Sequence, residues 1–554
     1  MNPRNSTRYM TICFRGNRSG RSGGVRGSSV TLVLVVCLWL ATALPAAADL
    51  QTVQVGGELR IRGQYWRHSF DDPTATTYTG NMIRWPASAL GGRPIGDPYG
   101  RQTIVSFFDW DNRGDDYRLV EQRTRLNVRA DFTEEVTGYI ELESYEAWGE
   151  DFRSNYITGV DRRGSGDVEV YQAYIELRDL FGVPLQLRLG RQEVVLGSGW
   201  LIGANDRLPE FGGLSFDAVR LTYATDQFSV DALWAKLAER FSDWNDCDRD
   251  LYALYGSYTG IEAVAFDAYW LLLRDAAPLR DTAATWLGEK IEDWLGLDDY
   301  ETTYLHTVGL RMHGERGGFD YSVDGAYQFG NASHVGVLFK PFVYGDADAE
   351  FDAWAGDLEI GYTFDHRMRP RLWIGAAYFE GEDNRDISFW EWWNPFAALV
   401  APRSSVSFNR LFSDKTYSPV LDDQGALTNF WTLRGGVSFA PTESVRLGLD
   451  AAWLEALETF DRPIHVRWGR TRIPILPAFS FLTTPTDDSL GWELGLWGEY
   501  AYSKDLVFRA GWHHFFTGKG SAEGNFVDLN GLLYHGGTDD QDADYLYLEA
   551  RVLF

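Results

Sequence analysis

The chain of 554 residues has little cysteine, little lysine and an overall shortage of positive charge. Two of its three cysteines, Cys13 and Cys37, lie in the N-terminal segment, so Cys247 is left without an internal disulfide partner. Only six of the 51 basic residues are lysines, and 79 acidic residues bring the net charge to -28. A nucleic-acid ligand requires a basic face, so we exclude nucleic acid as the partner. After residue 48 no apolar run is long enough for a membrane-spanning helix.

The N-terminal segment has the composition of a secretory signal peptide. Six arginines and no acidic residue precede Asp49, residues 30–44 form an apolar core, and three small residues end at Ala48. We therefore expect residues 1–48 to be a signal peptide, cleaved near Ala48, and residues 49–554 to be one exported domain. An uncleaved anchor helix is disfavoured by Pro45, and a lipoprotein cleavage site is disfavoured by the bulky Val36.

Period-two alternation runs through almost the whole of the remaining chain, as expected for strands with two different faces. In residues 58–65 the charged Glu58, Arg60 and Arg62 alternate with apolar side chains, and residues 123–132 repeat the pattern. Charged residues at alternate positions rule out strands that are buried on both faces.

The links between the expected strands alternate between short and long. Eight short turns are predicted at 133–136, 179–184, 224–227, 257–260, 314–318, 365–369, 440–444 and 503–505. Nine long loops lie between them, at 67–116, 149–168, 196–215, 238–250, 275–301, 332–350, 381–428, 458–489 and 517–543. The fold expected is all-β: a transmembrane antiparallel up-and-down barrel of about 18 strands over residues 55–554, with short periplasmic turns and long extracellular loops. A Greek-key sandwich or a propeller would not alternate so regularly.

A closed barrel explains how such strands could sit in a lipid bilayer, because it leaves no backbone hydrogen-bonding group unpaired. Aromatic residues near expected strand ends fit interfacial girdles: Tyr65, Trp66, Trp148, Tyr223, Trp234, Trp270 and Trp512. The last segment alternates and ends on Phe554, which resembles the signal by which barrel-insertion machinery recognises outer-membrane barrels. We expect the bacterial outer membrane as the location, and a monomer.

Four segments together resemble one family of outer-membrane channels. They are Glu121-Gln-Arg-Thr-Arg-Leu126, Val170-Tyr-Gln-Ala-Tyr174, Leu187-Arg-Leu-Gly-Arg-Gln192 and Ser215-Phe-Asp-Ala-Val-Arg-Leu-Thr-Tyr223. In this order they resemble the alginate-export family, most densely over residues 117–235. The resemblance implies an eighteen-stranded barrel with an arginine-lined constriction that passes an anionic polysaccharide or oligosaccharide.

Basic residues expected to face the lumen are Arg60, Arg62, Arg123, Arg125, Arg129, Arg188, Arg191, Arg220, Arg311, Arg434, Arg446, Arg509 and Arg551. A guanidinium keeps its charge and binds a carboxylate with two parallel hydrogen bonds, which suits uronate recognition. The predicted substrate path is the cluster in the first strands: Arg60, Arg62, Arg123, Arg125, Arg129, Arg188, Arg191 and Arg220. The alternative is that these arginines form cross-strand ladders with carboxylates such as Glu121, Glu141, Glu143 and Glu176.

A second class of function stays open at this point: a surface adhesin or structural barrel whose lumen is closed by its loops. Loops 67–116 and 381–428 could fold inward or outward, and the second carries Trp390, Trp392 and Trp393, which are suited to sugar stacking or loop packing.

No catalytic motif supports an enzyme, and an outer-membrane hydrolase is the least favoured reading. No cofactor is expected. Acidic loop residues could bind Ca²⁺ weakly, the candidates being Asp109, Asp111, Asp115 and Asp116.

Overall fold

The computed structural model describes most of the chain between residues 50 and 554. The described ranges are 50–68, 95–96, 102–103, 116–148, 168–239, 248–276, 302–331, 349–381, 404–423, 425–459, 462–463, 465–468, 471–474, 483–484, 486–523, 526–528, 533–535 and 541–554. The expected signal peptide and its cleavage site at Ala48 lie outside these residues.

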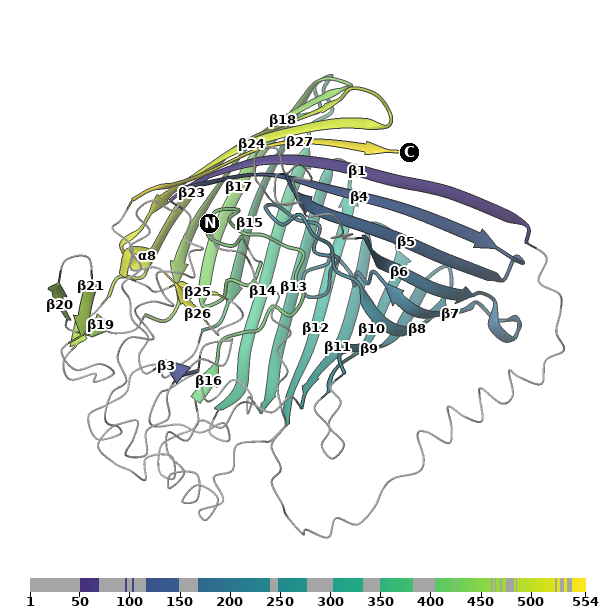
Figure 1. Ribbon diagram of the computed structural model, residues 1–554, viewed down its shortest axis with the longest axis horizontal. Coiled ribbons are helices and arrows are strands. Elements are labelled where there is room, and N and C mark those ends of the chain that lie inside the picture. The colour runs from purple at the N-terminus through teal and green to yellow at the C-terminus, as the bar shows by residue number, and fades with distance from the viewer. Residues whose placement is uncertain are drawn as a thin grey trace, which may run out of the picture.

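Eighteen strands pair antiparallel, each with its neighbours along the chain (Figure 1). They are β1 (Thr52–Arg67), β4 (Tyr117–Asp131), β5 (Val136–Ala147), β6 (Val168–Leu177), β7 (Leu185–Gln192), β8 (Phe216–Ala224), β9 (Phe228–Ala238), β10 (Arg249–Ile261), β11 (Val264–Asp275), β12 (Thr303–Arg316), β13 (Phe319–Asn331), β14 (Ala349–Thr363), β15 (Arg371–Phe379), β17 (Phe430–Thr442), β18 (Val445–Ala456), β23 (Ser489–Ala501), β24 (Leu506–Thr517) and β27 (Ala543–Leu553).

The sheet closes on itself because the first and last strands pair. In Figure 1 the purple β1 runs beside the yellow β27, and their register places Arg62 opposite Glu549. On its other side β1 pairs with β4, and β27 pairs with β24. The barrel of about eighteen strands predicted from the sequence is therefore confirmed.

The period-two pattern separates the two faces of the wall. On β27, Leu548 is 63% exposed, whereas the next residue, Glu549, is only 1% exposed. On β1, Arg62 is completely buried. Apolar side chains thus face outward, where a bilayer supplies the apolar solvent, and polar ones face the lumen.

All the short links but one overlap the predicted ranges, although β12 and β17 extend into the ranges predicted at 314–318 and 440–444. The turn predicted at 257–260 is wrong, because Ser257 and Tyr258 still pair with Asp267 and Phe266. The strand continues to Ile261, and the link to β11 is the two residues 262–263.

Small elements lie in the connections. They are β2 (Ile95–Gly96) with β3 (Gln102–Thr103), β16 (Ser404–Val406) beside β14, β19 (Arg462–Pro463) with β22 (Thr483–Thr484), β20 (His465–Trp468) with β21 (Thr471–Pro474), β25 (Phe526–Asp528) with β26 (Leu533–His535), η2 (Leu180–Gly182) and α8 (Lys519–Glu523). Within the described residues, no helix combines the length and apolar character that crossing a membrane would require.

The outward aromatics form the expected girdles, but one member is wrong. Trp148, Trp234 and Trp512 are exposed on the outer face. Trp66 points inward, is 2% exposed, and packs on Tyr545 with ring centroids 4.2 Å apart. Neighbouring residues of a strand face opposite sides, so Tyr65 and Trp66 cannot both face lipid.

Candidate functional site: the lumen and its inner loops

Two of the long connections turn into the barrel and fill much of the lumen. The first inner loop is residues 193–215, and the second inner loop is residues 407–423 with 425–429. Both contribute apolar side chains to one buried cluster, where Trp200 is 2% exposed and Phe408 is completely buried. Wall residues that these loops cover are not accessible from the lumen.

Arg62 on β1 fastens the first inner loop to the wall. Its Nε donates to Glu549 on β27 at 2.8 Å, and its Nη1 donates to the backbone carbonyls of Pro209 and Glu210 at 2.7 and 3.0 Å. The guanidinium therefore donates hydrogen bonds both to a fixed carboxylate and to the loop backbone.

Arg60 makes a second link to the same loop. It donates to Glu549 at 2.8 Å and to Asp206 of the loop at 2.5 Å. Burial alone would raise the pKa of the Asp206 carboxyl, but the positive charges of Arg60 and Arg123 outweigh this effect and hold that pKa below its usual value. Asp206 is thus a charged anchor at neutral pH.

Arg123 on β4 completes the attachment. Its Nη2 donates to Glu58 at 2.6 Å, and its Nη1 donates to the carbonyls of Phe211 and Gly212 at 3.0 and 2.5 Å. The ring of Phe211 also lies 4.9 Å from the guanidinium carbon of Arg62, within cation–π range. One aromatic side chain of the loop is therefore seated among the wall arginines.

Arg125 extends the attachment toward β5 and β6. It donates to Glu143 at 2.5 Å and to Glu193 of the loop at 3.3 Å, and its guanidinium carbon lies 3.7 Å from the ring centre of Tyr171. Burial raises the pKa of the Glu193 carboxyl, against the opposing effects of the Tyr171 hydroxyl and the Arg125 charge.

These four residues, Arg60, Arg62, Arg123 and Arg125, are called here the arginine cluster. They face inward as predicted, but the first inner loop covers them, and Arg62 and Arg123 have no exposed surface. At these four positions the arginines form the cross-strand pairs with carboxylates that the sequence offered as the alternative. Backbone carbonyls of the loop accept further hydrogen bonds from them.

Three further predicted arginines lie inward, close to the short-turn end of the barrel. Each is paired with a carboxylate: Arg129 with Asp131, Arg188 with Glu176, and Arg220 with Asp231. Their side chains keep 38%, 24% and 22% of their surface, so they are accessible from the lumen mouth. A role for them in the substrate path stays a prediction.

The placement of Arg191 in the lumen is wrong. It shares a face of β7 with Leu187 and Leu189, while the next residue, Gln192, is buried inside the barrel. Arg191 pairs with Asp217 at 2.8 Å on the outer surface. The period of two places it there, since Arg188 and Arg191 are three residues apart.

The second inner loop is attached to a different set of strands. Lys415 binds Asp357 of β14 at 2.5 Å, and Glu493 of β23 accepts hydrogen bonds from the Ser418 hydroxyl and from the backbone N–H of Val420. Within the loop, a completely buried pair joins Arg410 to Asp422 at 2.8 Å. Each inner loop is thus attached to its own set of strands.

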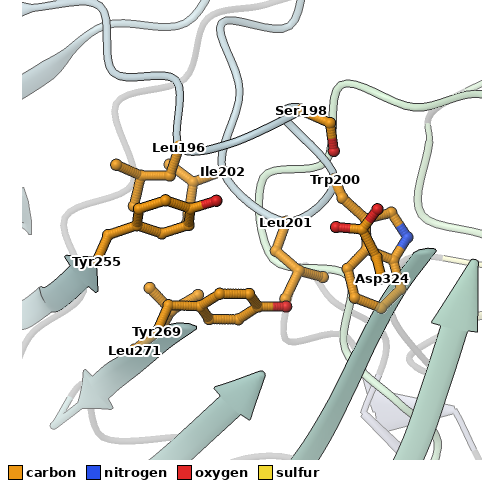
Figure 2. Close-up of a pocket in the computed structure, with 9 residues that line it drawn as sticks. All are labelled: Leu196, Ser198, Trp200, Leu201, Ile202, Tyr255, Tyr269, Leu271 and Asp324. Atoms are coloured by element: carbon orange, nitrogen blue, oxygen red, sulfur yellow. The ribbon is translucent and has the colours of Figure 1, made fainter. Parts of the chain in front are cut away.

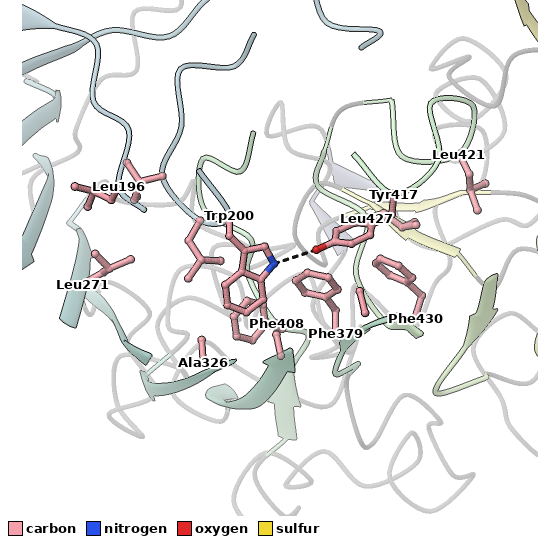
Figure 3. Packing of buried hydrophobic residues seen from close by; sticks show 14 of the residues in the cluster. Leu196, Trp200, Leu271, Ala326, Phe379, Phe408, Tyr417, Leu421, Leu427 and Phe430 are labelled. Carbon is pink, nitrogen blue, oxygen red and sulfur yellow. Dashed lines mark hydrogen bonds between the residues drawn. The ribbon is translucent and has the colours of Figure 1, made fainter. Parts of the chain in front are cut away.

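The two inner loops are also joined to each other. Backbone hydrogen bonds run from Gly203 N–H to Phe412 O at 2.8 Å and from Phe412 N–H to Leu201 O at 2.9 Å. The indole N–H of Trp200 donates to the Tyr417 hydroxyl at 3.0 Å, as Figure 3 shows within the buried cluster. The two loops form one unit, which joins the strands that hold the first loop to the strands that hold the second.

The first inner loop packs closely against β10 and β11. Figure 2 shows Leu201 and Ile202 of the loop facing Tyr255 and Tyr269 of these strands. The cavity between them has a volume of about 20 Å³, which is room for one water molecule but not for a sugar.

A much larger cavity of about 540 Å³ lies on the side of the later strands. Its walls are the inward faces of β14, β15, β17, β18, β23, β24 and β27, and Arg207 and the second inner loop close it from within. Four arginines and four carboxylates line it: Arg207, Arg434, Arg446, Arg509, Glu359, Asp450, Glu493 and Glu499.

Most of these charges are partnered. Arg434 binds Asp357 at 3.2 Å, and Arg509 binds Glu499 at 2.9 Å. Arg446 differs: it is exposed, donates to the Ser438 hydroxyl at 3.5 Å, and makes no ion pair with any described residue. Its guanidinium carbon lies 5.5 Å from the ring centre of Trp497.

The sequence identified Arg434, Arg446 and Arg509 as inward residues but did not select them for the substrate path. It missed Trp373 and Trp497, which also line the cavity. Their positions in the alternation were available in the sequence, because inward and outward residues alternate along β15 and β23. What the sequence could not supply was the wall against which each inner loop lies.

Several predicted residues are not placed. Trp390, Trp392 and Trp393, and the Ca²⁺ candidates Asp109, Asp111 and Asp115, lie outside the described residues. Asp116 is described and accepts a hydrogen bond from the backbone N–H of His68 at 3.2 Å. Across the described part of the chain, no three His, Cys, Asp or Glu side chains gather as metal ligands.

A closed barrel with an apolar outer face and a charged lumen defines a class, the outer-membrane β-barrel transport channels. The family model for alginate export matches residues 107–519, about three quarters of the sequence. The chain belongs to the alginate export family, which confirms the resemblance found in the sequence. No curated protein matches the sequence.

Solved outer-membrane proteins align with the chain along most of its length. OccD3 (OpdP) of Pseudomonas aeruginosa is 11% identical with a TM-score of 0.43, covering 91% of this chain and 92% of that chain. OccK5 (OpdH) of the same organism is 10% identical with a TM-score of 0.41, covering 90% and 98%. OmpT of Vibrio cholerae is 12% identical with a TM-score of 0.34, covering 92% and 99%. The fold assignment rests on the strand pairings.

Proposed function

We propose that this channel passes an anionic oligosaccharide or polysaccharide along the 540 Å³ cavity, between the inner loops and the later strands. The observation that carries the proposal is Arg446, an exposed guanidinium on this wall that forms no ion pair with any described residue, although Glu499 lies opposite it in the strand register. A guanidinium of this kind binds a uronate carboxylate with two parallel hydrogen bonds.

The charge balance of the cavity sets the strength of the selectivity. Because four carboxylates accompany the four arginines, the path is not uniformly basic. A preference for anions is therefore expected to be modest, and no single site holds the sugar tightly. Conduction needs this property, since a substrate that binds too strongly does not leave.

Reversal potentials in a planar bilayer with a salt gradient test the proposal. The unmodified barrel should prefer anions, and Arg446→Gln should move the reversal potential toward cation preference. Arg191→Gln is the matched control, because it removes an arginine from the outer face and should leave the reversal potential unchanged. A reversal potential that Arg446→Gln does not move would contradict the proposal.

The alternative of a loop-closed adhesin or structural barrel is favoured by one observation, the joining of the two inner loops across the lumen. The same bilayer distinguishes it. A barrel that stays silent at every voltage, including after the ties of the first inner loop are removed, would support the closed barrel and overturn the channel path proposed here.

Three finer statements belong to the same proposal. The mature chain begins after Ala48, the terminal strand serves as the recognition signal for barrel insertion, and the barrel acts as a monomer. In support of the second, Phe554 is 67% exposed at the end of β27. Mass spectrometry of the N-terminus, insertion kinetics of Phe554→Ser and native mass spectrometry in detergent test them in turn.

A further inference from the structure

Four aromatic rings line the large cavity, and each belongs to the inward face of a wall strand. They are Trp373 on β15, Trp497 on β23, His513 on β24 and Tyr547 on β27. An inward aromatic residue of a barrel can stand out into the lumen or lie against the wall. The residue directly opposite on the neighbouring strand decides between these two arrangements.

Each of the four rings faces a glycine across the strand pair. Trp373 is paired with Gly436, Trp497 with Gly448, His513 with Gly495, and Tyr547 with Gly511. A residue without a side chain leaves the ring free to lean over the neighbouring strand. The same pairing at four places on one wall shows a shared arrangement.

The rings do lie over these glycines. A Cβ atom at Gly448 would stand 2.2 Å from Cε2 of Trp497, and one at Gly436 would stand 2.6 Å from Nε1 of Trp373. At Gly511 it would stand 2.4 Å from the ring of Tyr547. The rings occupy the space that a side chain would need, so each ring packs directly on the glycine backbone.

Hydrogen bonds and neighbouring rings fix these four rings in place. Asp450 accepts the indole N–H of Trp497 at 2.6 Å, and the Asp450 carboxylate and the Trp373 indole lie together over Gly436. The rings of His513 and Tyr547 are inclined by 19° with centroids 6.4 Å apart. Trp373 and Trp497 keep partly exposed surface at the cavity, whereas His513 and Tyr547 are only 6% and 5% exposed.

We propose that Trp373 and Trp497, called here the aromatic track, bind the sugar rings of the substrate by stacking, with His513 and Tyr547 buried beside them. The apolar face of a pyranose ring carries C–H groups whose hydrogens are attracted by the negative face of an aromatic ring. This inference rests on the proposed function and adds to it a contact that does not depend on the charge of the sugar.

The arginines stand beside the track and add the charge-dependent part. The guanidinium carbon of Arg446 lies 5.5 Å from the ring centre of Trp497, and that of Arg434 lies 5.8 Å from the ring centre of Trp373. A sugar stacked on Trp497 thus brings its carboxylate to Arg446, whereas Arg434 is already paired with Asp357. The track selects the saccharide, and Arg446 selects the anion.

Blocking of single channels by a matched pair of sugars tests the track. The probes are a β-1,4-linked hexamer of mannose and the hexamer of the corresponding uronate, which differ only at C6, a hydroxymethyl group in the first and a carboxylate in the second. Both should block the channel transiently, the uronate for longer. Trp497→Ala and Trp373→Ala should shorten the residence time of both hexamers by about fivefold to tenfold.

The controls separate stacking from folding and from charge. Trp453→Ala removes a tryptophan from the outer face and should change neither residence time. Gly448→Ala keeps every ring but displaces Trp497, and should act like Trp497→Ala. Heat-modifiability on gels confirms that each variant is folded. Arg446→Gln should shorten the residence of the uronate only.

Residence times that stay unchanged in Trp497→Ala, Trp373→Ala and Gly448→Ala would overturn the track, and so would a neutral hexamer that never blocks. Neither result touches the proposed function if Arg446→Gln still shifts the reversal potential. Conversely, a reversal potential unmoved by Arg446→Gln would remove the anion path while leaving the track measurable with the neutral hexamer.

Discussion

The wall made by β1, β4 and β27 and the wall made by β15, β17, β18 and β23 both carry inward arginines, yet they are used differently. On the first wall Arg62 and Arg123 have no exposed surface, since the first inner loop lies on them. On the second wall Arg446 is exposed beside a cavity of about 540 Å³. Similar residues at similar positions in the alternation thus hold a loop in one place and line an open space in the other.

The difference shows that the period-two alternation identifies the face on which a residue lies, but not whether its side chain is exposed to the lumen. A buried guanidinium is stable only if its donors are used by carboxylates or carbonyls. The arginine cluster meets most of this condition with Glu58, Glu143, Glu549 and the backbone of the first inner loop, while Nη2 of Arg62 and Nη2 of Arg125 are buried without a hydrogen-bond partner among the described residues. Its role is therefore attachment, and the path proposed here lies along the open wall.

The strongest disruption of the first wall should come from Arg62→Leu. This change removes the Arg62 charge from Glu549, which keeps Arg60 and a longer ion pair with Arg509 at 4.0 Å, and it removes two hydrogen bonds to the loop backbone. Removing one partner of a buried ion pair costs about 3 kcal/mol or more in free energy of unfolding. Urea unfolding of the barrel in lipid vesicles measures it.

The control for this variant is Arg191→Leu, which breaks the exposed pair with Asp217. Exposed pairs contribute up to about 1 kcal/mol, so the loss should be much smaller. Equal losses for the two variants would mean that Arg62 is not an anchor.

A smaller change should loosen the first inner loop while keeping every charge. A Cβ atom at Gly213 would stand 2.2 Å from Nη2 of Arg125 and 2.4 Å from the Tyr171 hydroxyl. Gly213→Ala should therefore cost about 1 kcal/mol in free energy of unfolding and make the single-channel current noisier. Gly325→Ala, where a Cβ meets nothing within 4 Å, should do neither.

The smallest effect is a pH dependence of the attachment of the first inner loop. Because the pKa of Asp206 is lowered in the folded barrel, its contribution is present above its ordinary pKa and is lost as the pH falls through the lowered value. We expect the tie to Arg60 to hold from pH 7 to about pH 4 and to weaken only below that.

The pKa of Glu193 is shifted in the opposite direction from that of Asp206. Burial raises its pKa, so its contribution is present below the ordinary value and is lost as the pH rises through the raised one. A slight tightening of the loop should thus precede the loosening when the pH falls. Conductance recorded from pH 7 to pH 3 checks both effects, and Asp206→Asn should abolish the acid limb. An acid limb that survives in Asp206→Asn would assign it to another group.

The sequence predicted much of the fold, because its evidence is local. The number of strands, the short turns and the inward face of Arg123 follow from period-two alternation and turn spacing. The errors at Trp66 and Arg191 came from setting that period aside for a single residue.

The site could be predicted only in part, because its geometry depends on contacts between distant segments. The bond from Trp200 to Tyr417 joins residues 217 positions apart, and the pair of Arg60 with Glu549 spans 489. No local pattern reveals which loop turns inward or which wall it covers. The sequence therefore placed the path on the richer arginine wall, which the first inner loop occupies.

The central claim, that the open path runs along the later strands, is tested most directly by the accessibility of single cysteines. In a background where Cys13, Cys37 and Cys247 are replaced by serine, Arg446→Cys places a thiol on the open wall, and Gln192→Cys places one at a completely buried inward position beside the first inner loop. A charged thiol-reactive reagent added during single-channel recording should modify the first and lower its current, and should leave the second unchanged. Rapid modification of Gln192→Cys with no reaction at Arg446→Cys would contradict the account.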